Sequence, residues 1–425
     1  MTDRRASVKG FPRGACALPF VAEALACALL AWLASCDDAG MQTVLVAAAL
    51  WSSSGVMADP LIGVEDGRVV AIHSRREREI PSTARVVDYS ACILAPAFLD
   101  IHIHGCAGQD VMQADASGMA AISRFLGMRG TGGFLATTVT APLEATLRSL
   151  ERMAAMMRSE QAWLGAVPCG IHLEGPFLSH AKRGVHPPGD LLEPSIAVFD
   201  RMMEAAGGRV RLMTLAPELP GAVELARHAT QCGVRVSMGH SNATAQEAER
   251  LIEAGAISAT HTFNAMRALD HREPGIAGVV LTQEALYAEL ICDGIHVDPR
   301  MVRLWWRLKG RQRGILVTDA MAATGMPEGE YQLGGMTVQL TNGRATAHGV
   351  LAGSVLTLDR ALANLMEFTG ESVEHVLPLL TENPAALLNS DAHGRDLRVG
   401  QRADIVALSG EGRLIASLMA GVAQR

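Results

Sequence analysis

The stretch Ile93-Leu-Ala-Pro-Ala-Phe-Leu-Asp-Ile-His-Ile-His-Gly105 decides how this 425-residue chain is interpreted. An apolar run leads to Asp100 and then to His102 and His104, which are separated by one residue. In a β-strand, residues i and i+2 share a face, so both imidazoles would point the same way. Two imidazoles at the exit of a buried strand suit a divalent transition metal such as zinc. A His-x-His pair alone is also typical of surface or core histidines, so the rest of the chain has to be considered.

The centre of the chain alternates strand-like apolar runs with Ala- and Leu-rich helical stretches, such as residues 245–254. Eight strand-like runs are predicted, and they end near Ile103, Val139, Glu174, Pro217, His240, Phe263, Asp293 and Ala320. Eight βα units over this length are typical of a closed parallel barrel. An open doubly wound sheet is the alternative, but it does not explain why polar residues follow so many runs. We therefore predict an α/β fold centred on a (β/α)8 TIM-like barrel over residues 93–379.

Short β-type runs flank the predicted barrel on both sides. They are separated by Gly, Ser, Pro and charged residues, and they cover residues 43–48, 61–65, 68–73, 84–88, 400–408 and 413–422. We expect the two termini to pair into one small β-sandwich domain, made of residues 41–92 and 380–425.

Residues 1–40 differ from the rest of the chain. A basic start precedes an apolar segment that ends in Leu-Ala-Ser-Cys36, as in a secretory signal or a lipoprotein processing box. Pro19 and Glu23 interrupt the apolar segment. We interpret residues 1–40 as an extension ahead of a cytoplasmic protein. The alternative is export, or anchoring as a lipoprotein, with residues 1–36 acting as the signal.

The composition excludes several classes of partner. With 49% hydrophobic residues and only 19% charged residues, the chain is typical of a packed globular protein. The net charge of −7 does not favour nucleic acid or an anionic membrane as a partner, so an anionic substrate needs a local basic site. No CxxC pair occurs, which favours reduced thiols in a reducing compartment. The eight cysteines are Cys16, Cys27, Cys36, Cys92, Cys106, Cys169, Cys232 and Cys292.

Metal-binding side chains follow several of the predicted strands. In a closed barrel the carboxyl ends of the strands converge on one mouth, so residues far apart in sequence become neighbours. Glu174, His240 and His261 follow the third, fifth and sixth runs and form a coherent set of zinc ligands. His102 and His104 could hold a second ion beside this set.

Further polar residues at the predicted mouth suggest catalytic roles. Asp319 follows the last strand and could accept a proton from an activated water and later return it; a helix N-cap is the alternative. His296 would donate a hydrogen bond to a substrate oxygen, or support the site from behind. His172 lies two residues before Glu174 and faces the same way, deeper in the barrel. Arg272, in a loop bounded by Gly and Pro, offers forked donors for a phosphate; a solvated loop arginine is the alternative.

Several short sequence motifs around these residues closely resemble the motifs of one enzyme family. They are Asp100-Ile-His-Ile-His-Gly, His172-Leu-Glu-Gly-Pro-Phe, Gly239-His-Ser-Asn-Ala, Thr260-His-Thr-Phe-Asn-Ala-Met, His271-Arg-Glu-Pro-Gly, Asp293-Gly-Ile-His-Val-Asp, Val317-Thr-Asp-Ala-Met, Leu351-Ala-Gly-Ser and Glu382-Asn-Pro-Ala. From about Met41 to the end, the chain resembles the amidohydrolase superfamily and, within it, the N-acetylglucosamine-6-phosphate deacetylases.

The resemblance implies hydrolysis of the acetamide on a sugar 6-phosphate by a homodimer, with release of acetate. It implies that Glu174, His240 and His261 bind the main metal and that Asp319 is the proton donor and acceptor. The positions matching substrate-binding residues of the family are Val185, His186, Asn264, Ala265, Arg272, Asp293, His296, Leu351, Ala352 and Gly353. The ion is expected to be zinc, in one or two copies, with iron or another divalent metal as the alternative.

Two other functions compete with this one. The nearer is another amidohydrolase, such as a cyclic amidase or a deaminase, which would share the metal ligands but not the sugar phosphate site. The segment His271-Arg-Glu-Pro-Gly and the lack of a barrel-end lysine beside the metal set favour the deacetylase. The farther alternative is a non-catalytic metal-binding, membrane-tethered protein, which only residues 1–40 support. We expect no stable membrane partner.

Overall fold

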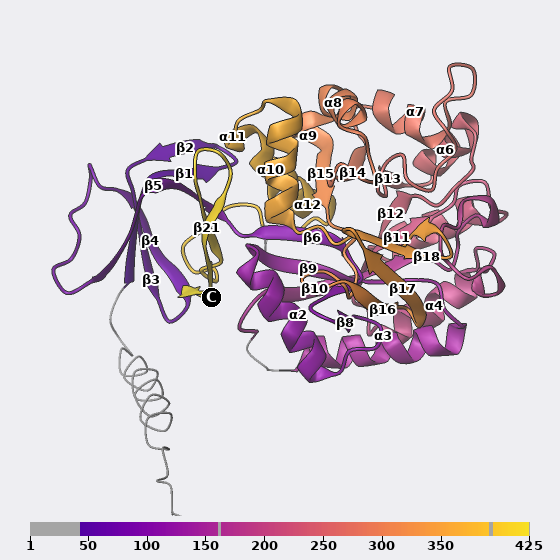
Figure 1. Cartoon of the computed structure of the whole chain (residues 1–425), viewed down its shortest axis with the longest axis horizontal. Coiled ribbons are helices and arrows are strands. Elements are labelled where there is room, and N and C mark those ends of the chain that lie inside the picture. The colour runs from indigo at the N-terminus through magenta and orange to yellow at the C-terminus, as the bar shows by residue number, and fades with distance from the viewer. Residues whose placement is uncertain (1–42, 160–162, 391–393, 425) are drawn as a thin grey trace, which may run out of the picture. The chain divides into compact units, whose positions relative to one another are not determined.

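The computed structural model describes residues 43–159, 163–390 and 394–424, and eight parallel strands form the centre of its fold (Figure 1). The predicted extension, residues 1–40, lies outside the described residues. The barrel strands follow one another around the sheet in the order of the sequence, each paired in parallel with the next. They are β6 (Phe98–Ile103), β9 (Thr131–Thr138), β10 (Val167–Glu174), β11 (Val210–Leu215), β12 (Arg235–Met238), β13 (Ala256–Ala259), β14 (Tyr287–Ile291) and β15 (Gly314–Val317).

Contacts between the first and the last strand bring the sheet close to a full circle. The Asp100 carboxylate, at the middle of β6, accepts a hydrogen bond from the Thr318 hydroxyl at 2.6 Å. Beyond the end of β15, the Asp319 N–H donates to the His102 carbonyl oxygen at 2.9 Å. Ala320 continues this pairing as a parallel bridge to Ile103. The predicted TIM-like barrel is therefore confirmed, and its closure places Asp319 beside the His-x-His segment.

Helices cover the outside of the barrel, and amphipathic helices such as α3 and α5 turn an apolar stripe toward the strands. The predicted helix at 245–254 is confirmed by α6, which Thr244 and Glu247 start with a reciprocal capping box. The helices are α2 (Ala116–Met128), α3 (Leu143–Arg158), α4 (Ile196–Ala205), α5 (Ala222–Gln231), α6 (Ala245–Glu253), α7 (Gly275–Thr282), α8 (Pro299–Leu308), α9 (Gly310–Arg313), α10 (Leu358–Thr369), α11 (Val373–Val376) and α12 (Glu382–Leu387).

Strands from both ends of the chain build one β domain, as predicted, and they are joined in a single sheet (Figure 1, indigo and yellow). Its members are β1 (Thr43–Ser52), β2 (Gly55–Ala58), β3 (Pro60–Glu65), β4 (Arg68–Ser74), β5 (Arg85–Pro96), β20 (Ile405–Leu408), β21 (Leu414–Met419) and β22 (Val422–Ala423). β20 pairs with β5 and joins the two halves. The α/β fold with a β domain built from both termini is thus confirmed, whereas the domain limits at 92 and 380 stay predictions.

The stretch from Ile93 to Gly105 is not one strand. Residues up to Pro96 belong to β5 of the terminal sheet, and the barrel strand β6 starts only at Phe98. Between them, the Ala97 N–H donates to the Asp404 carbonyl oxygen at 3.0 Å. The apolar run is continuous because the chain passes from one buried sheet directly into the other.

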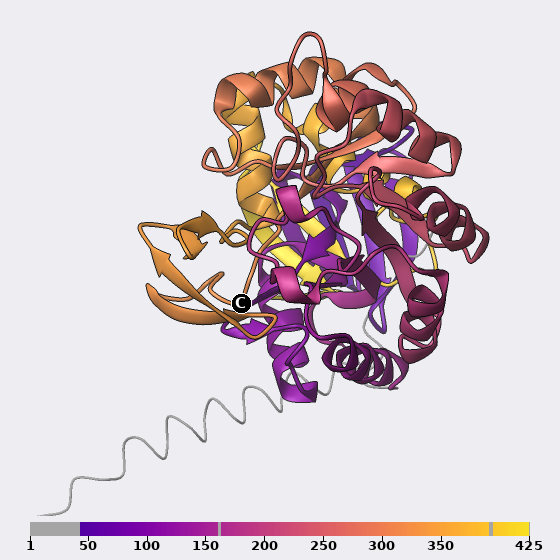
Figure 2. The same cartoon turned by 90° about the vertical axis from the view of Figure 1, so that its right-hand side faces the viewer.

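A four-stranded antiparallel sheet follows β15, and the sequence analysis did not predict it. It consists of β16 (Gly329–Leu333), β17 (Met336–Thr341), β18 (Arg344–Ala347) and β19 (Val350–Leu351), and we call it the mouth sheet. It is seen in orange at the left of Figure 2. Leu333, Val350 and Leu351 from this sheet line the same cavity as the strand-end residues.

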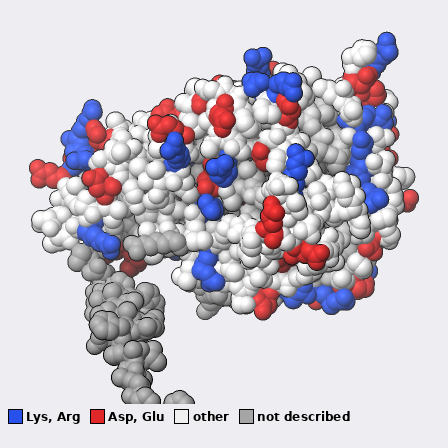
Figure 3. All heavy atoms as spheres, viewed as in Figure 1, with Lys and Arg blue, Asp and Glu red and all other residues white. Residues whose placement is uncertain are grey.

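Charges of both signs are interspersed on the face of the molecule shown in Figure 3. Of the helices in the described part of the chain, none has the length and apolar character needed to cross a membrane. The cysteines within the described ranges are free thiols; Cys92, Cys106 and Cys292 are buried, and Cys232 is exposed.

Candidate active site

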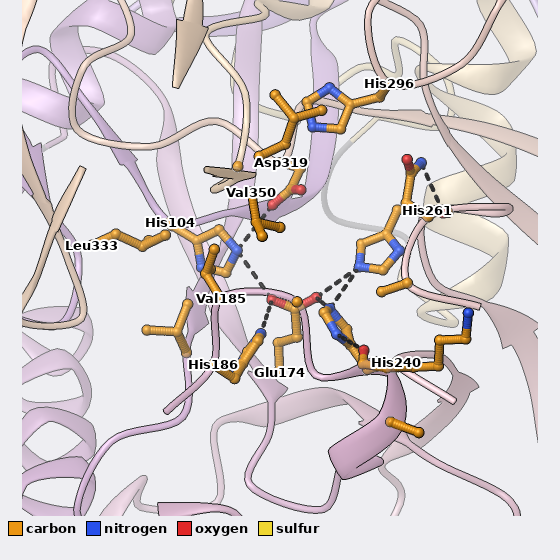
Figure 4. Close-up of a pocket in the computed structure, with 18 residues that line it drawn as sticks. His104, Glu174, Val185, His186, His240, His261, His296, Asp319, Leu333 and Val350 are labelled. Atoms are coloured by element: carbon orange, nitrogen blue, oxygen red, sulfur yellow. Dashed lines mark hydrogen bonds and ion pairs between the residues drawn. The ribbon is translucent and has the colours of Figure 1, made fainter. Parts of the chain in front are cut away.

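The side chains predicted to carry the chemistry meet at the carboxyl ends of the barrel strands (Figure 4). Glu174 ends β10, whereas His240, His261 and Asp319 each follow a strand by two residues. These last three residues have positive φ angles of 46°, 32° and 50°. The left-handed region is unfavourable for residues other than glycine, and residues held there cluster at active sites. The barrel therefore turns its backbone sharply at the points where these side chains enter the mouth.

Glu174 is the centre of the cluster. Its Oε1 lies 3.2 Å from His240 Nε2 and 3.0 Å from His261 Nε2. Its Oε2 lies 3.2 Å from His104 Nε2, which is in turn 3.0 Å from Asp319 Oδ1. Two overlapping groups of possible metal ligands result, and they share Glu174. They are Glu174, His240 and His261, and His102, His104, Glu174 and Asp319.

Backbone carbonyl groups set the tautomers of two of these histidines. His240 Nδ1 lies 3.0 Å from the Lys182 carbonyl oxygen, and His104 Nδ1 lies 3.1 Å from the Thr137 carbonyl oxygen. A carbonyl oxygen only accepts, so each Nδ1 carries the proton and each neutral ring presents an unprotonated Nε2 to Glu174. Lone pairs on imidazoles and carboxylates then face one another, and a cation between them removes the repulsion. The residues present therefore fit a divalent metal.

The electrostatics also favour positive charge at this point. Burial opposes a charge on the His104 imidazole, but hydrogen bonds to Asp319 and Glu174 raise its pKa to about 9, so without an ion a proton on Nε2 takes the place that a metal would fill. Burial would raise the Asp319 pKa, yet the neighbouring His102 and His104 hold it below its usual value. Asp319 is therefore ionised at neutral pH and able to accept a proton.

A buried carboxylate that the sequence analysis missed orients His102. Glu289, on β14, places its Oε2 3.3 Å from His102 Nδ1, and both side chains are fully buried. The arrangement matches the carboxylate–histidine pairs that direct imidazoles toward metals. A signal was present in the sequence, because Glu289 is the only charged residue in the strand segment Tyr287–Ile291.

His186 differs from the metal-facing histidines. Its Nδ1 accepts a hydrogen bond from the Thr140 N–H at 3.2 Å, so the proton of the neutral ring lies on Nε2. Burial lowers the His186 pKa to about 3, which keeps the ring neutral. Its Nε2, 3.7 Å from Glu174 Oε2, is thus a hydrogen-bond donor at the cavity wall and not a metal ligand.

His296 points into the cavity from the segment after β14 (Figure 4). Its Nδ1 lies 2.7 Å from Asp293 Oδ2. Burial lowers the His296 pKa, but the hydrogen bond to Asp293 outweighs burial and leaves the pKa above its usual value. Asp293 therefore orients the ring and favours its protonated form, in which Nε2 is a donor facing the cavity; the predicted role of His296 stays a prediction. His172 lies fully buried below the mouth, with Nε2 2.8 Å from the Thr214 hydroxyl oxygen.

The cavity over the cluster has a volume of about 370 Å³. Lys182, which the sequence analysis did not single out, also lines it. Of the predicted substrate contacts, those that line it are Val185, His186, Asn264, Ala265, His296, Leu351 and Gly353. Arg272, Asp293 and Ala352 do not line it. Arg272 is exposed, and Ala352 is fully buried. These substrate contacts therefore remain predictions.

A family model described as the amidohydrolase family matches residues 93–424, which includes the whole barrel and each cluster residue. The chain belongs to the amidohydrolase family. This family depends on divalent metals, in agreement with the two ligand groups at the barrel mouth.

Individual relatives indicate which group within the family this chain resembles. The chain is 38% identical over 369 residues to an N-acetylgalactosamine-6-phosphate deacetylase from Escherichia coli O157:H7, covering 87% of this chain and 95% of that enzyme. It is 34% identical over 378 residues to an N-acetylglucosamine-6-phosphate deacetylase from Bacillus subtilis (strain 168), covering 88% and 94%. The family expected from the sequence motifs is thus confirmed.

The same relationship is found among solved structures. A mutant N-acetyl-D-glucosamine-6-phosphate deacetylase from Mycobacterium smegmatis, in complex with N-acetyl-D-glucosamine-6-phosphate, superimposes with a TM-score of 0.82 at 31% identity, covering 90% of this chain and 99% of that chain. The enzyme from Pasteurella multocida superimposes with a TM-score of 0.82 at 26% identity, with the same coverage.

Proposed function

We propose that the protein removes the acetyl group from an N-acetylated amino sugar 6-phosphate, releasing acetate and the free amine. The observation that carries the proposal is the convergence of Glu174, His240 and His261 with Asp319 at one barrel mouth. The relatives named for this activity, at 34–38% identity over most of the chain, support the same conclusion.

The roles of the side chains follow from their geometry. Glu174, His240 and His261 would hold the main ion, with His102 and His104 offering ligands for a second. When bound, a divalent ion lowers the pKa of water and polarises a carbonyl group. Asp319 takes the proton of the attacking water and returns it to the leaving amine. Nε2 of His186, and Nε2 of His296 in its protonated form, face the cavity, where they would donate to oxygen atoms of the substrate.

The acetate-release assay tests this function directly. We expect the purified protein to release acetate from N-acetylglucosamine 6-phosphate or from its galactosamine epimer, and a chelator to stop the reaction. Both epimers are required because the relatives include deacetylases named for each. Release of ammonia, or cleavage of a cyclic amide in place of the acetyl sugar, would assign the protein to another branch of its family.

Glu289→Gln is expected to weaken the metal site at His102 more than the main site, which Glu289 contacts only through the His261 N–H. The amide retains the size of the side chain but presents a donor to His102 Nδ1, which favours the tautomer with a protonated Nε2. Loss of such a supporting carboxylate lowers metal affinity by roughly 10- to 100-fold. Metal titration followed by elemental analysis measures the two affinities. Glu284→Gln, in the exposed loop before β14, is the control; equal affinities in both variants would exclude a role for Glu289.

Arg272→Ala is expected to affect phosphorylated substrates selectively. Within the described residues, no hydrogen bond or ion pair of its guanidinium group is found, so it is free to bind a phosphate. A charge-assisted hydrogen bond contributes about 1.5–3 kcal/mol, so kcat/KM for the 6-phosphate should fall roughly 10- to 150-fold. Arg227→Ala, on the exposed side of α5, serves as the control. An equal loss on unphosphorylated N-acetylglucosamine would remove Arg272 from phosphate binding.

We also propose zinc as the bound ion, because two imidazoles and one carboxylate are typical of zinc enzymes. Iron is the alternative, because the family depends on divalent metals in general.

We further propose that the protein is a homodimer and that it is located in the cytoplasm. The location is supported by the phosphorylated substrate and by the free thiols. Light scattering and cell fractionation test these two points.

A further inference from the structure

One wall of the cavity is apolar and consists of two residues that are not among the predicted substrate contacts. Val139 follows β9 and Leu333 ends β16; both are at least 97% buried, and both line the cavity together with His104. In Figure 4, Leu333 lies on the His104 side of the cluster, away from His261 and His240. We call Val139 and Leu333 the acyl wall.

A buried carboxylate holds the acyl wall in place. The Gly334 N–H donates to Asp110 Oδ2 at 2.6 Å, and Asp110 Oδ1 accepts from the Met112 N–H at 2.7 Å. Gly334 has a φ of +57° and packs so closely on Val139 that a side chain at this position would collide with it. The turn between β16 and β17 is thereby fixed to the barrel at the point where Leu333 enters the cavity.

The two ends of the scissile amide need different surroundings. The sugar end carries hydroxyl groups and a phosphate, which suit polar side chains such as Lys182, Asn264 and His296 on the cavity wall. The acyl end of an acetamide is a single methyl group, whose burial is favourable only against apolar atoms. Val139 and Leu333 supply such atoms beside His104, which is 3.0 Å from the proposed proton acceptor Asp319.

We propose that the acyl wall binds the acyl group of the substrate and makes the enzyme select acetyl over longer acyl groups. This inference rests on the proposed deacetylase function and adds a specificity-determining surface to it. Asp110 is a positioning residue, because it acts on the substrate only through the turn that carries Leu333.

The test compares kcat/KM for N-formyl, N-acetyl, N-propionyl and N-butyryl glucosamine 6-phosphate. An apolar pocket discriminates one methylene by roughly 10- to 200-fold, so the wild type should prefer acetyl over propionyl by at least about tenfold. Leu333→Ala should lower the acetyl-to-butyryl ratio at least about tenfold. Leu333→Phe should reduce turnover of the acetyl substrate and retain turnover of the formyl substrate. Asp110→Asn should also lower the acetyl-to-butyryl ratio.

Leu340→Ala is the matched control, because Leu340 is buried in β17 of the same mouth sheet but does not line the cavity. It should retain the wild-type ratio even if the protein is destabilised. A ratio of two substrates does not depend on the folded fraction, so weakly folding variants still give an answer. Wild-type ratios in both Leu333→Ala and Val139→Ala would overturn the acyl wall. A wild type that cleaves none of the four substrates would instead overturn the proposed function.

Discussion

Asp319→Asn is expected to lower kcat by roughly two to four orders of magnitude, the range for loss of a general acid–base group. The asparagine retains the size of the side chain, but it neither takes a proton from water nor returns one to the amine. Asparagine also tolerates the left-handed backbone of this position, where φ is 50°. The loss should therefore come from chemistry and not from misfolding.

Steady-state kinetics with elemental analysis separates these causes. The Asp319→Asn protein should retain the main ion, because Glu174, His240 and His261 are unchanged. Asp200→Asn, an exposed carboxylate on α4 that pairs with His228, is the control and should behave as the wild type. Retained turnover in Asp319→Asn would remove this residue from the proton transfer.

Removal of the metal is expected to abolish acetate release and to lower the melting temperature. Without a cation, Nε2 of His240, Nε2 of His261 and Oε1 of Glu174 face one another at 3.0–3.2 Å. A ligand that binds only the folded state stabilises it by about 2.7–4.1 kcal/mol at 100 to 1,000 times its Kd. Calorimetry of chelated and reloaded protein measures this difference, and an acetate assay on the same samples measures activity. An apoprotein as active and as stable as the loaded protein would contradict the proposal.

The barrel was predictable because its signal repeats eight times. Each buried strand is apolar, and short polar segments follow it, so a local pattern revealed a global fold. The break between β5 and β6 was not predictable from this pattern, because the residues on both sides of it, from Ile93 to Leu99, are apolar. The mouth sheet was missed for a different reason. Its strands are two to six residues long, which is too short to show a clear alternation of apolar and polar residues.

The candidate site was predictable where side chains follow directly from strand ends. Glu174, His240, His261 and Asp319 meet as expected because parallel strands of a barrel converge at one mouth. Glu289 and Leu333 were missed because their roles come from tertiary contacts, with His102 and with the cavity. Glu289 could have been singled out as the lone carboxylate in an apolar strand. Nothing in the sequence distinguishes Leu333 from an ordinary core leucine.

Anomalous X-ray diffraction from crystals of the metal-loaded protein tests the central claim most directly. The account predicts a peak at the barrel mouth, at metal–ligand distances of about 2.0–2.2 Å from a Glu174 oxygen and from Nε2 of His240 and His261. A second peak is predicted beside His102 and His104 where two ions bind. An active enzyme with no anomalous peak among these side chains would contradict the account.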